Sequence, residues 1–353
     1  MTWRINNFDL VRLLAALQVA IVHMIGYLKL SGPTVGIVGF GLQMFPGVPV
    51  FFLISGVLIS RSFERSASIR EYYRNRCLRI FPALWICLLV TVGVILACGV
   101  GAVGVTSTSE WLIWWADQMS GLEAYPPAFN PSLWTIPVEL EFYLLLPAIY
   151  AVLKLREQRG NVLLLTLLVA SLATRLACVN GAPLSRIGVA ALLVPTVVPH
   201  LWMFLSGVLA QRNWARIRHL FAGQFRWWIL GYLVVRALVA RFHVALGGLE
   251  INPALFVLLS GVVLSGAMSG RSLSNRLLRH NDISYGTYIY HMLVVNLLVQ
   301  YAAPGSAWTV AIALAASLAL AALSWRLVEM PFLAQKHQSV QTAASMSAPG
   351  LLT

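Results

Sequence analysis

Residues 8–30 read FDLVRLLAALQVAIVHMIGYLKL, a long apolar run that is interrupted by Asp9, Arg12 and His23. About 20 apolar residues in a helix span the hydrocarbon core of a bilayer, which is about 30 Å thick. The apolar residues are continuous rather than alternating, which favours a helix over a barrel strand. Because no small-residue cleavage site follows a short apolar core, we interpret the run as a retained first transmembrane helix.

Similar apolar runs recur along the whole chain. Of its 353 residues, 59% are hydrophobic and only 10% are charged, whereas a soluble domain carries about 25% charged residues. This composition excludes a water-soluble enzyme and predicts an all-α, polytopic membrane bundle of about ten transmembrane helices. The predicted spans are 8–30, 42–61, 80–104, 132–154, 161–179, 187–210, 226–246, 253–270, 284–303 and 306–328.

The formal net charge of +13 has a topological explanation. Most Lys and Arg residues lie in alternate connections between the predicted spans, as the positive-inside rule requires of cytoplasmic segments. We therefore expect both termini in the cytoplasm, and no nucleic-acid partner. Residues 1–335 form the predicted membrane domain. Residues 336–353, rich in Ser, Thr, Ala and Gln, are expected to form a disordered cytoplasmic tail.

The ionisable side chains of the first run are candidate functional residues, because an ionisable group inside a membrane costs about 2.5–3.5 kcal/mol. Asp9 and Arg12 share a helix face and can form an ion pair that only fixes the helix at the interface. His23 lies about 21 Å further along the helix than Asp9. It is either a hydrogen-bonding member of a helix interface or a group that takes up a proton near neutral pH.

The segment Pro131–Tyr143 opens the predicted fourth helix at its outer end and carries Glu139 and Glu141. Two residues apart on a helix, these carboxylates point to different faces, so at most one is expected to face a site. Both could instead be solvated at the membrane interface. His200 and the Tyr-rich stretch that ends at His291 are weaker candidates, since either histidine can be a packing residue.

Arginines gather just before the predicted third span, where Arg76 and Arg79 share a helical face and Arg74 lies close by. A guanidinium group binds phosphate in a bidentate manner, so this cluster could hold an anionic donor at the cytoplasmic mouth of the bundle. Positive-inside charge, or contact with anionic lipid head groups, explains the same residues. The four cysteines have neither paired nor metal-ligand spacing, so we expect no disulfide framework and no metal site.

Taken together, these segments resemble the acyltransferase-3 family of integral membrane acyltransferases, which modify bacterial surface polysaccharides and other extracytoplasmic acceptors. The chain departs from the family pattern at three positions. Thr135 and Ile136 stand where the family usually has Ser and Leu, and Glu141 stands where many relatives have Gln. The resemblance covers nearly the whole chain. It rests on Asp9-x-x-Arg12 with His23, on Gly47–Ile59, on Arg76-x-x-Arg79 with Pro82, on Trp134–Tyr143, on Ile283–His291, and on Glu329 with Pro331.

The resemblance implies roles for several of the candidate residues. In the family, the first-helix histidine is taken as catalytic and the Arg-x-x-Arg pair as part of acyl-CoA binding. Carried over, His23 becomes the catalytic candidate, and Arg76 and Arg79 become donor contacts, with Arg74 as a further one. Arg12 and Glu139 become functional residues, which we place in the donor site and the catalytic site respectively.

The implied function is transfer of an acyl group, expected to be acetyl, from cytoplasmic acetyl-CoA to a hydroxyl of an extracytoplasmic sugar. A lipopolysaccharide O-antigen or an exopolysaccharide is the expected acceptor, and the bacterial inner membrane is the expected location. His23 would act either as general base or as transient acyl acceptor. Asp9 is too far along the helix to orient His23, so an orienting carboxylate would come from another helix, with Glu139 as a candidate. The alternative is a transporter or flippase of a lipid-linked glycan, which would not consume acyl-CoA.

Overall fold

The computed structural model describes residues 7–98, 115–117, 130–155, 157, 160–179, 196–241, 251–270, 273–279, 281–301 and 305–335. Within these ranges the chain forms helices and no strands, which confirms the all-α prediction. The predicted tail at 336–353 lies outside the described residues.

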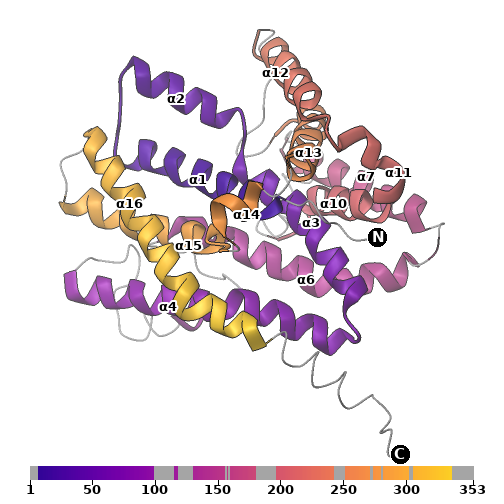
Figure 1. Cartoon of the computed structure of the whole chain (residues 1–353), viewed down its shortest axis with the longest axis horizontal. Helices are drawn as coiled ribbons and strands as arrows, with labels where there is room; N and C mark the ends of the chain where they lie inside the picture. The colour runs from indigo at the N-terminus through magenta and orange to yellow at the C-terminus, as the bar shows by residue number, and fades with distance from the viewer. Residues whose placement is uncertain are drawn as a thin grey trace, which may run out of the picture.

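The helices of the described ranges form an irregular bundle (Figure 1). The elements are α1 (Phe8–Tyr27), α2 (Pro33–Gln43), α3 (Gly47–Arg65), α4 (Ile69–Cys98), η1 (Pro131–Trp134), α6 (Thr135–Val152), α7 (Gly160–Val179), α10 (Leu201–Arg212), α11 (Trp214–Phe221), α12 (Phe225–Arg241), α13 (Pro253–Met268), α14 (Leu273–Leu278), α15 (Ser284–Tyr301), α16 (Ala307–Ser324) and the π-helical turn η2 (Trp325–Glu329).

Several of these helices can cross a membrane. Among the described residues, six helical stretches are long and apolar enough by length and composition, and α13 is a shorter apolar helix. The multi-pass membrane prediction is therefore confirmed, whereas the count of ten spans and the cytoplasmic position of both termini stay predictions. The six stretches are Phe8–Tyr27, Pro33–Arg65, Ile69–Cys98, Pro131–Val152, Gly160–Ala177 and Ala307–Gln335.

Helix α4 begins well before the predicted span at residue 80, so the arginine cluster lies within a helix rather than in a connection. Its start is stabilised by a reciprocal cap. The Ser68 hydroxyl accepts from the Glu71 amide at 3.1 Å, and the Glu71 carboxylate accepts from the Ala67 amide at 2.8 Å. This Ser-x-x-Glu pattern satisfies amide groups that would otherwise be unpaired at a helix start. Helix α2 likewise occupies a segment that was expected to be a connection.

Glycines bring neighbouring helices into backbone contact. A Cβ atom at Gly56 of α3 would collide with the carbonyl group of Phe204, and one at Gly207 of α10 would collide with that of Leu53. Gly286 of α15 faces Ala321 of α16 in the same way. Helices in lipid associate through close van der Waals packing, for which small residues are favoured.

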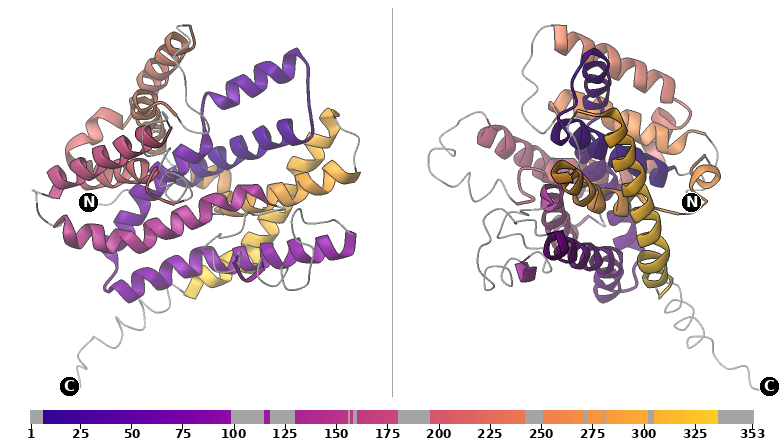
Figure 2. Two further views of the ribbon diagram at one scale, coloured as in Figure 1. Left: turned by 180° about the vertical axis from the view of Figure 1, so that it is seen from behind. Right: turned by 90° about the vertical axis from the view of Figure 1, so that its left-hand side faces the viewer.

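Helix α1 lies inside the bundle, packed against α3 and α15, and these contacts position the residues described next (Figure 2). Ala20 and Met24 of α1 are fully buried against Met292 and Val295 of α15. Towards its C-terminal end, α16 runs beside α4, where η2 contacts α4 (Figure 1).

Candidate functional site

His23 of α1 and His291 of α15 form a hydrogen-bonded pair. Nδ1 of His23 lies 2.9 Å from Nε2 of His291. The two rings stack with centroids 5.2 Å apart and planes 19° from parallel. His291 is fully buried, whereas His23 is half-buried. The apolar contacts between α1 and α15 set the register that makes this pair possible.

The second ring nitrogen of His291 is held by the backbone of its own helix. Nδ1 lies 2.6 Å from the carbonyl oxygen of Tyr288 and 3.3 Å from that of Thr287. The Tyr288 hydroxyl donates to the Ser132 carbonyl at 2.8 Å and accepts from the Thr135 hydroxyl at 2.9 Å. The turn of α15 that carries His291 is therefore anchored to η1 and to the start of α6.

Four charged residues from four parts of the chain meet in a buried cluster near the start of α1. Arg12 pairs with Asp282 at 2.8 Å, and Arg79 binds the same carboxylate oxygen. Arg79 also lies 3.6 Å from Glu329, whose side chain is 2% exposed. The π-helical turn η2 places Glu329 in this cluster, and such turns occur frequently at functional sites.

Asp282 was not among the residues predicted from the sequence. Its other carboxylate oxygen accepts from the amide and the hydroxyl of Ser284, at 3.2 and 2.5 Å. Burial by itself would raise the pKa of Asp282, but Arg12 and Arg79 outweigh it and hold that pKa at about 2. The negative charge at this position is therefore kept. The only sequence signal was an Asp two residues before the Ser that begins α15.

Glu139 lies in the interior of the bundle. Its carboxylate accepts from the Ser55 hydroxyl at 2.6 Å and from the Tyr143 hydroxyl at 2.5 Å. With Arg12 and Tyr285 it lines a small pocket between α1, α3, α6 and α15. Glu141 instead accepts from the Val197 amide at 2.7 Å. The two carboxylates thus point to different faces of α6, as their spacing predicted.

The three arginines of the α4 cluster have different surroundings. Arg79 is in the buried charge cluster, with a side chain that is 13% exposed. Arg74 is exposed and donates to the Gln335 carbonyl at 3.2 Å. Arg76 donates to the Ser62 hydroxyl at 3.1 Å, and its guanidinium lies 5.8 Å from the Tyr143 ring centroid. Its Nε is buried and has no hydrogen-bond partner among the described residues.

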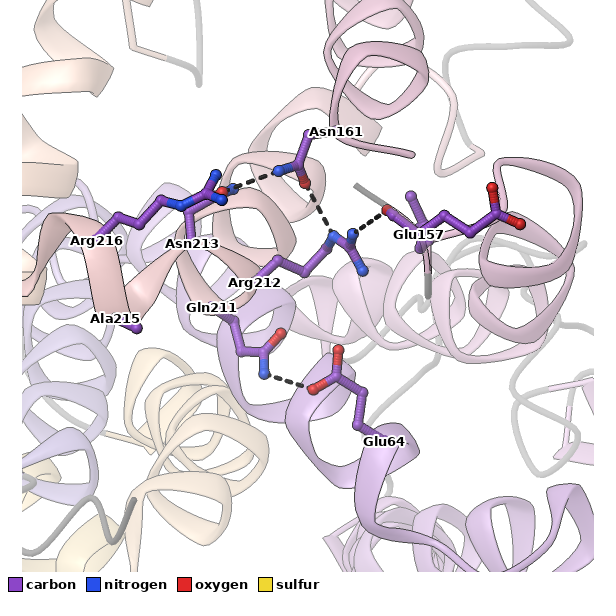
Figure 3. A pocket seen from close by; sticks show the side chains of 9 residues that line it. Glu64, Glu157, Asn161, Gln211, Arg212, Asn213, Ala215 and Arg216 are labelled. Carbon is purple, nitrogen blue, oxygen red and sulfur yellow. Dashed lines mark hydrogen bonds between the residues drawn. The ribbon is translucent and has the colours of Figure 1, made fainter. Parts of the chain in front are cut away.

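A larger polar pocket of about 400 Å³ lies elsewhere, between α7, α10 and α11 (Figure 3). Arg212 donates to the Asn161 side chain at 3.1 Å and to the Glu157 carbonyl at 3.2 Å. Asn161 in turn donates to Asn213 at 2.9 Å. These side chains bind one another, so the network ties three helices together. The pocket lining, as far as the structure describes it, includes neither His23 nor Arg76.

Residues 5–326 match a family whose description is acyltransferase domain, the acyltransferase-3 family. Nodulation protein 10 of Rhizobium leguminosarum bv. viciae is 34% identical over 92% of this chain and 92% of its own length. The O-acetyl transferase of Shigella phage Sf6 is 28% identical over 93% of this chain and 96% of its own. The peptidoglycan O-acetyltransferase OatA of Listeria monocytogenes is 25% identical over 81% of this chain and 51% of its own length. No solved structure matches the chain significantly.

Proposed function

This chain belongs to the acyltransferase-3 family and is a multi-pass membrane acyltransferase, and on this premise we propose that it moves an acetyl group from cytoplasmic acetyl-CoA to a hydroxyl of an extracytoplasmic glycan. The names of two relatives, an O-acetyl transferase and a peptidoglycan O-acetyltransferase, support an oxygen acceptor. We place the protein in the bacterial inner membrane, where acetyl-CoA and a surface glycan lie on opposite sides.

The observation that carries the proposal is the spacing of Arg12 and His23 along α1, which separates a cationic site for an anionic donor from a site for proton transfer. Arg12 lies in an arginine-rich cluster near one end of the helix, and His23 follows eleven residues later. At about 1.5 Å per residue, the two are about 16 Å apart along the helix axis. If the phosphates of acetyl-CoA bind at the arginine residues, its uncharged pantetheine arm would extend towards His23 and place the thioester there.

Arg76 is the proposed principal contact of the donor phosphates. Its Nε lacks a partner among the described residues, and a guanidinium group suits phosphate binding. Arg74, exposed on the same helix, adds a second positive charge. Arg12 and Arg79 already bind Asp282, so we propose that they shape the mouth of the donor site and add positive potential there.

In the proposed reaction, the acceptor hydroxyl oxygen forms a bond to the thioester carbonyl carbon, and the carbon–sulfur bond breaks. His23 takes the hydroxyl proton as general base and returns it to the leaving thiolate. In the covalent variant, His23 first forms a bond to the acyl carbon as the carbon–sulfur bond breaks and the thiolate leaves. The acceptor hydroxyl oxygen then bonds to the acyl carbon as the carbon–nitrogen bond breaks, and the hydroxyl proton restores the thiol. We propose that Glu139 organises the pocket beside Arg12, since its carboxylate already binds Ser55 and Tyr143.

The test is acetyl transfer from radiolabelled acetyl-CoA in membranes that contain His23→Ala. General acid–base catalysis contributes typically about 10²–10⁴-fold in rate, and we expect a loss of that order. His219→Ala is the matched control, because His219 is exposed on α11. Undiminished transfer by His23→Ala would overturn the role of His23. Failure of the unmodified protein to release free CoA while exporting a glycan would favour the transporter alternative.

A further inference from the structure

The hydrogen bonds of His291 determine which nitrogen of His23 is available for chemistry. The carbonyl oxygen of Tyr288, 2.6 Å from Nδ1 of His291, can only accept a hydrogen bond. Nδ1 of His291 must therefore carry a proton, and in a neutral imidazole the other nitrogen, Nε2, is then an acceptor. That acceptor lies 2.9 Å from Nδ1 of His23, so Nδ1 of His23 must be the donor.

A doubly protonated His291 would not fit this arrangement. It would place a positive charge on a side chain that is fully buried, next to the apolar Met292 and Val295. An uncompensated buried charge is strongly disfavoured, and among the described residues the hydrogen-bond partners of the His291 ring are carbonyl groups and a histidine rather than a carboxylate. The neutral form, with its proton on Nδ1, is the one that satisfies both ring nitrogens.

We propose that His291 is a positioning residue that holds His23 in the tautomer with a proton on Nδ1 and a free lone pair on Nε2. The inference rests on the proposed acyl transfer and deepens it by naming the reacting atom. The lone pair of Nε2 takes the proton from the acceptor hydroxyl as its oxygen–carbon bond forms. The same proton then passes to sulfur as the carbon–sulfur bond breaks. In the covalent variant, the same lone pair forms the bond to the acyl carbon.

His291 takes the position that a carboxylate occupies in a Ser-His-Asp triad, but it carries no charge. A neutral acceptor orients the ring of His23 and stabilises its protonated form less than a carboxylate would. The proton on Nε2 is therefore readily returned to the leaving thiolate. The sequence expectation of an orienting carboxylate is replaced here by a second histidine, which Tyr288 connects to η1 and α6.

The tautomer can be read directly by nitrogen-15 NMR of histidine-labelled protein in detergent or lipid. The His23 signals among the seven histidines are identified by their absence from His23→Ala. We expect a protonated Nδ1 and an unprotonated Nε2 for His23 in the unmodified protein. In His291→Leu, where the acceptor is gone, we expect the Nε2-protonated tautomer to become the major form. A wild-type His23 with its proton on Nε2 would overturn the inference.

Kinetics provide the second readout. Loss of one orienting hydrogen bond should lower kcat of His291→Leu about 10- to 100-fold with KM for acetyl-CoA unchanged. His291→Gln keeps an oxygen that can accept from Nδ1 of His23 and should recover much of the lost kcat. Equal kcat in all three proteins would overturn the positioning role. Full activity of His23→Ala would instead overturn the proposed function, so the two failures are distinct. The NMR measurement on unmodified protein applies even if His291→Leu does not fold.

Discussion

Arg76 and Arg79 lie one helical turn apart on α4, yet their guanidinium groups have different partners. The Arg-x-x-Arg spacing predicted that they share a face, and the resemblance implied that both contact the donor. The carboxylate that binds Arg79 belongs to Asp282, which is 203 residues away in the chain. No local pattern predicts a contact of that range, and this is why the sequence could not separate the two arginines.

Arg76→Ala should weaken donor binding selectively. Hydrogen bonds to charged groups contribute about 1.5–3 kcal/mol, which corresponds to about a 10- to 150-fold rise in KM for acetyl-CoA. Acetyl-pantetheine lacks the nucleotide and its phosphates, so its KM should not change. Arg218→Ala, an exposed arginine on α11, is the matched control. Equal losses with both donors would show that Arg76 is not a phosphate contact.

Asp282→Asn should destabilise the folded protein. It leaves the charges of Arg12 and Arg79 close together and without their shared carboxylate, and breaking a buried pair typically costs about 3–5 kcal/mol. The measurement is thermal unfolding of purified protein in detergent. The control is Glu157→Gln, whose exposed carboxylate points away from Arg212 (Figure 3).

The loss of stability in Asp282→Asn should depend on pH, and the sign of that dependence follows from the pKa of Asp282. The pKa of Asp282 in the folded protein, about 2, lies below its unfolded value of about 3.9. Its stabilising contribution is therefore fully present above about pH 4 and is lost as pH falls through the folded pKa. The gap in unfolding temperature between Asp282→Asn and the unmodified protein should be constant at pH 5–7 and shrink below about pH 4. A gap that widens at low pH would contradict the assignment.

At the scale of helices, the length of continuous apolar runs predicted α6, α7, α12, α13 and α15 to within about five residues. The predicted bounds were less accurate where a helix includes polar sequence, as α4 does from its start at Ile69. The capping pattern at Ser68 and Glu71 was the available signal there. The pairing of α3 with α10 was not predictable, because Gly56 and Gly207 are 151 residues apart and each looks like an ordinary glycine of an apolar run.

Gly207→Val should prevent α3 and α10 from packing. The new side chain would collide with the Leu53 carbonyl, which is backbone and cannot move without displacing α3. Overpacking costs typically about 1–3 kcal/mol and more where backbone must shift. We expect lower yield of extracted protein and a lower unfolding temperature. Gly231→Ala on α12, with nothing within 4 Å of the new Cβ, should leave both unchanged or slightly improved. Equal stability of the two variants would contradict the close approach.

At the scale of the whole molecule, helix ends that were predicted to share one side of the membrane contact one another. Asn7 donates to the Ser269 carbonyl at 2.6 Å, and Arg74 to that of Gln335 at 3.2 Å, on the predicted cytoplasmic side. On the predicted outer side, the Gly305 amide donates to the Leu28 carbonyl at 2.9 Å. Charge alone could not show which ends meet, and the side of the membrane on which each end lies stays a prediction.

The proposed reaction requires a definite orientation, because acetyl-CoA is cytoplasmic and the glycan is not. In a protein whose single cysteine is introduced by Arg218→Cys on α11, that cysteine should react with a membrane-impermeant maleimide only after cells are permeabilised. One at Ser31, exposed just beyond α1, should react in spheroplasts that are intact. Both are introduced after the native cysteines are replaced by serine, since Cys77 and Cys98 are exposed. The opposite labelling pattern would place the arginines on the side without acetyl-CoA, and the donor site proposed at Arg76 would then be wrong.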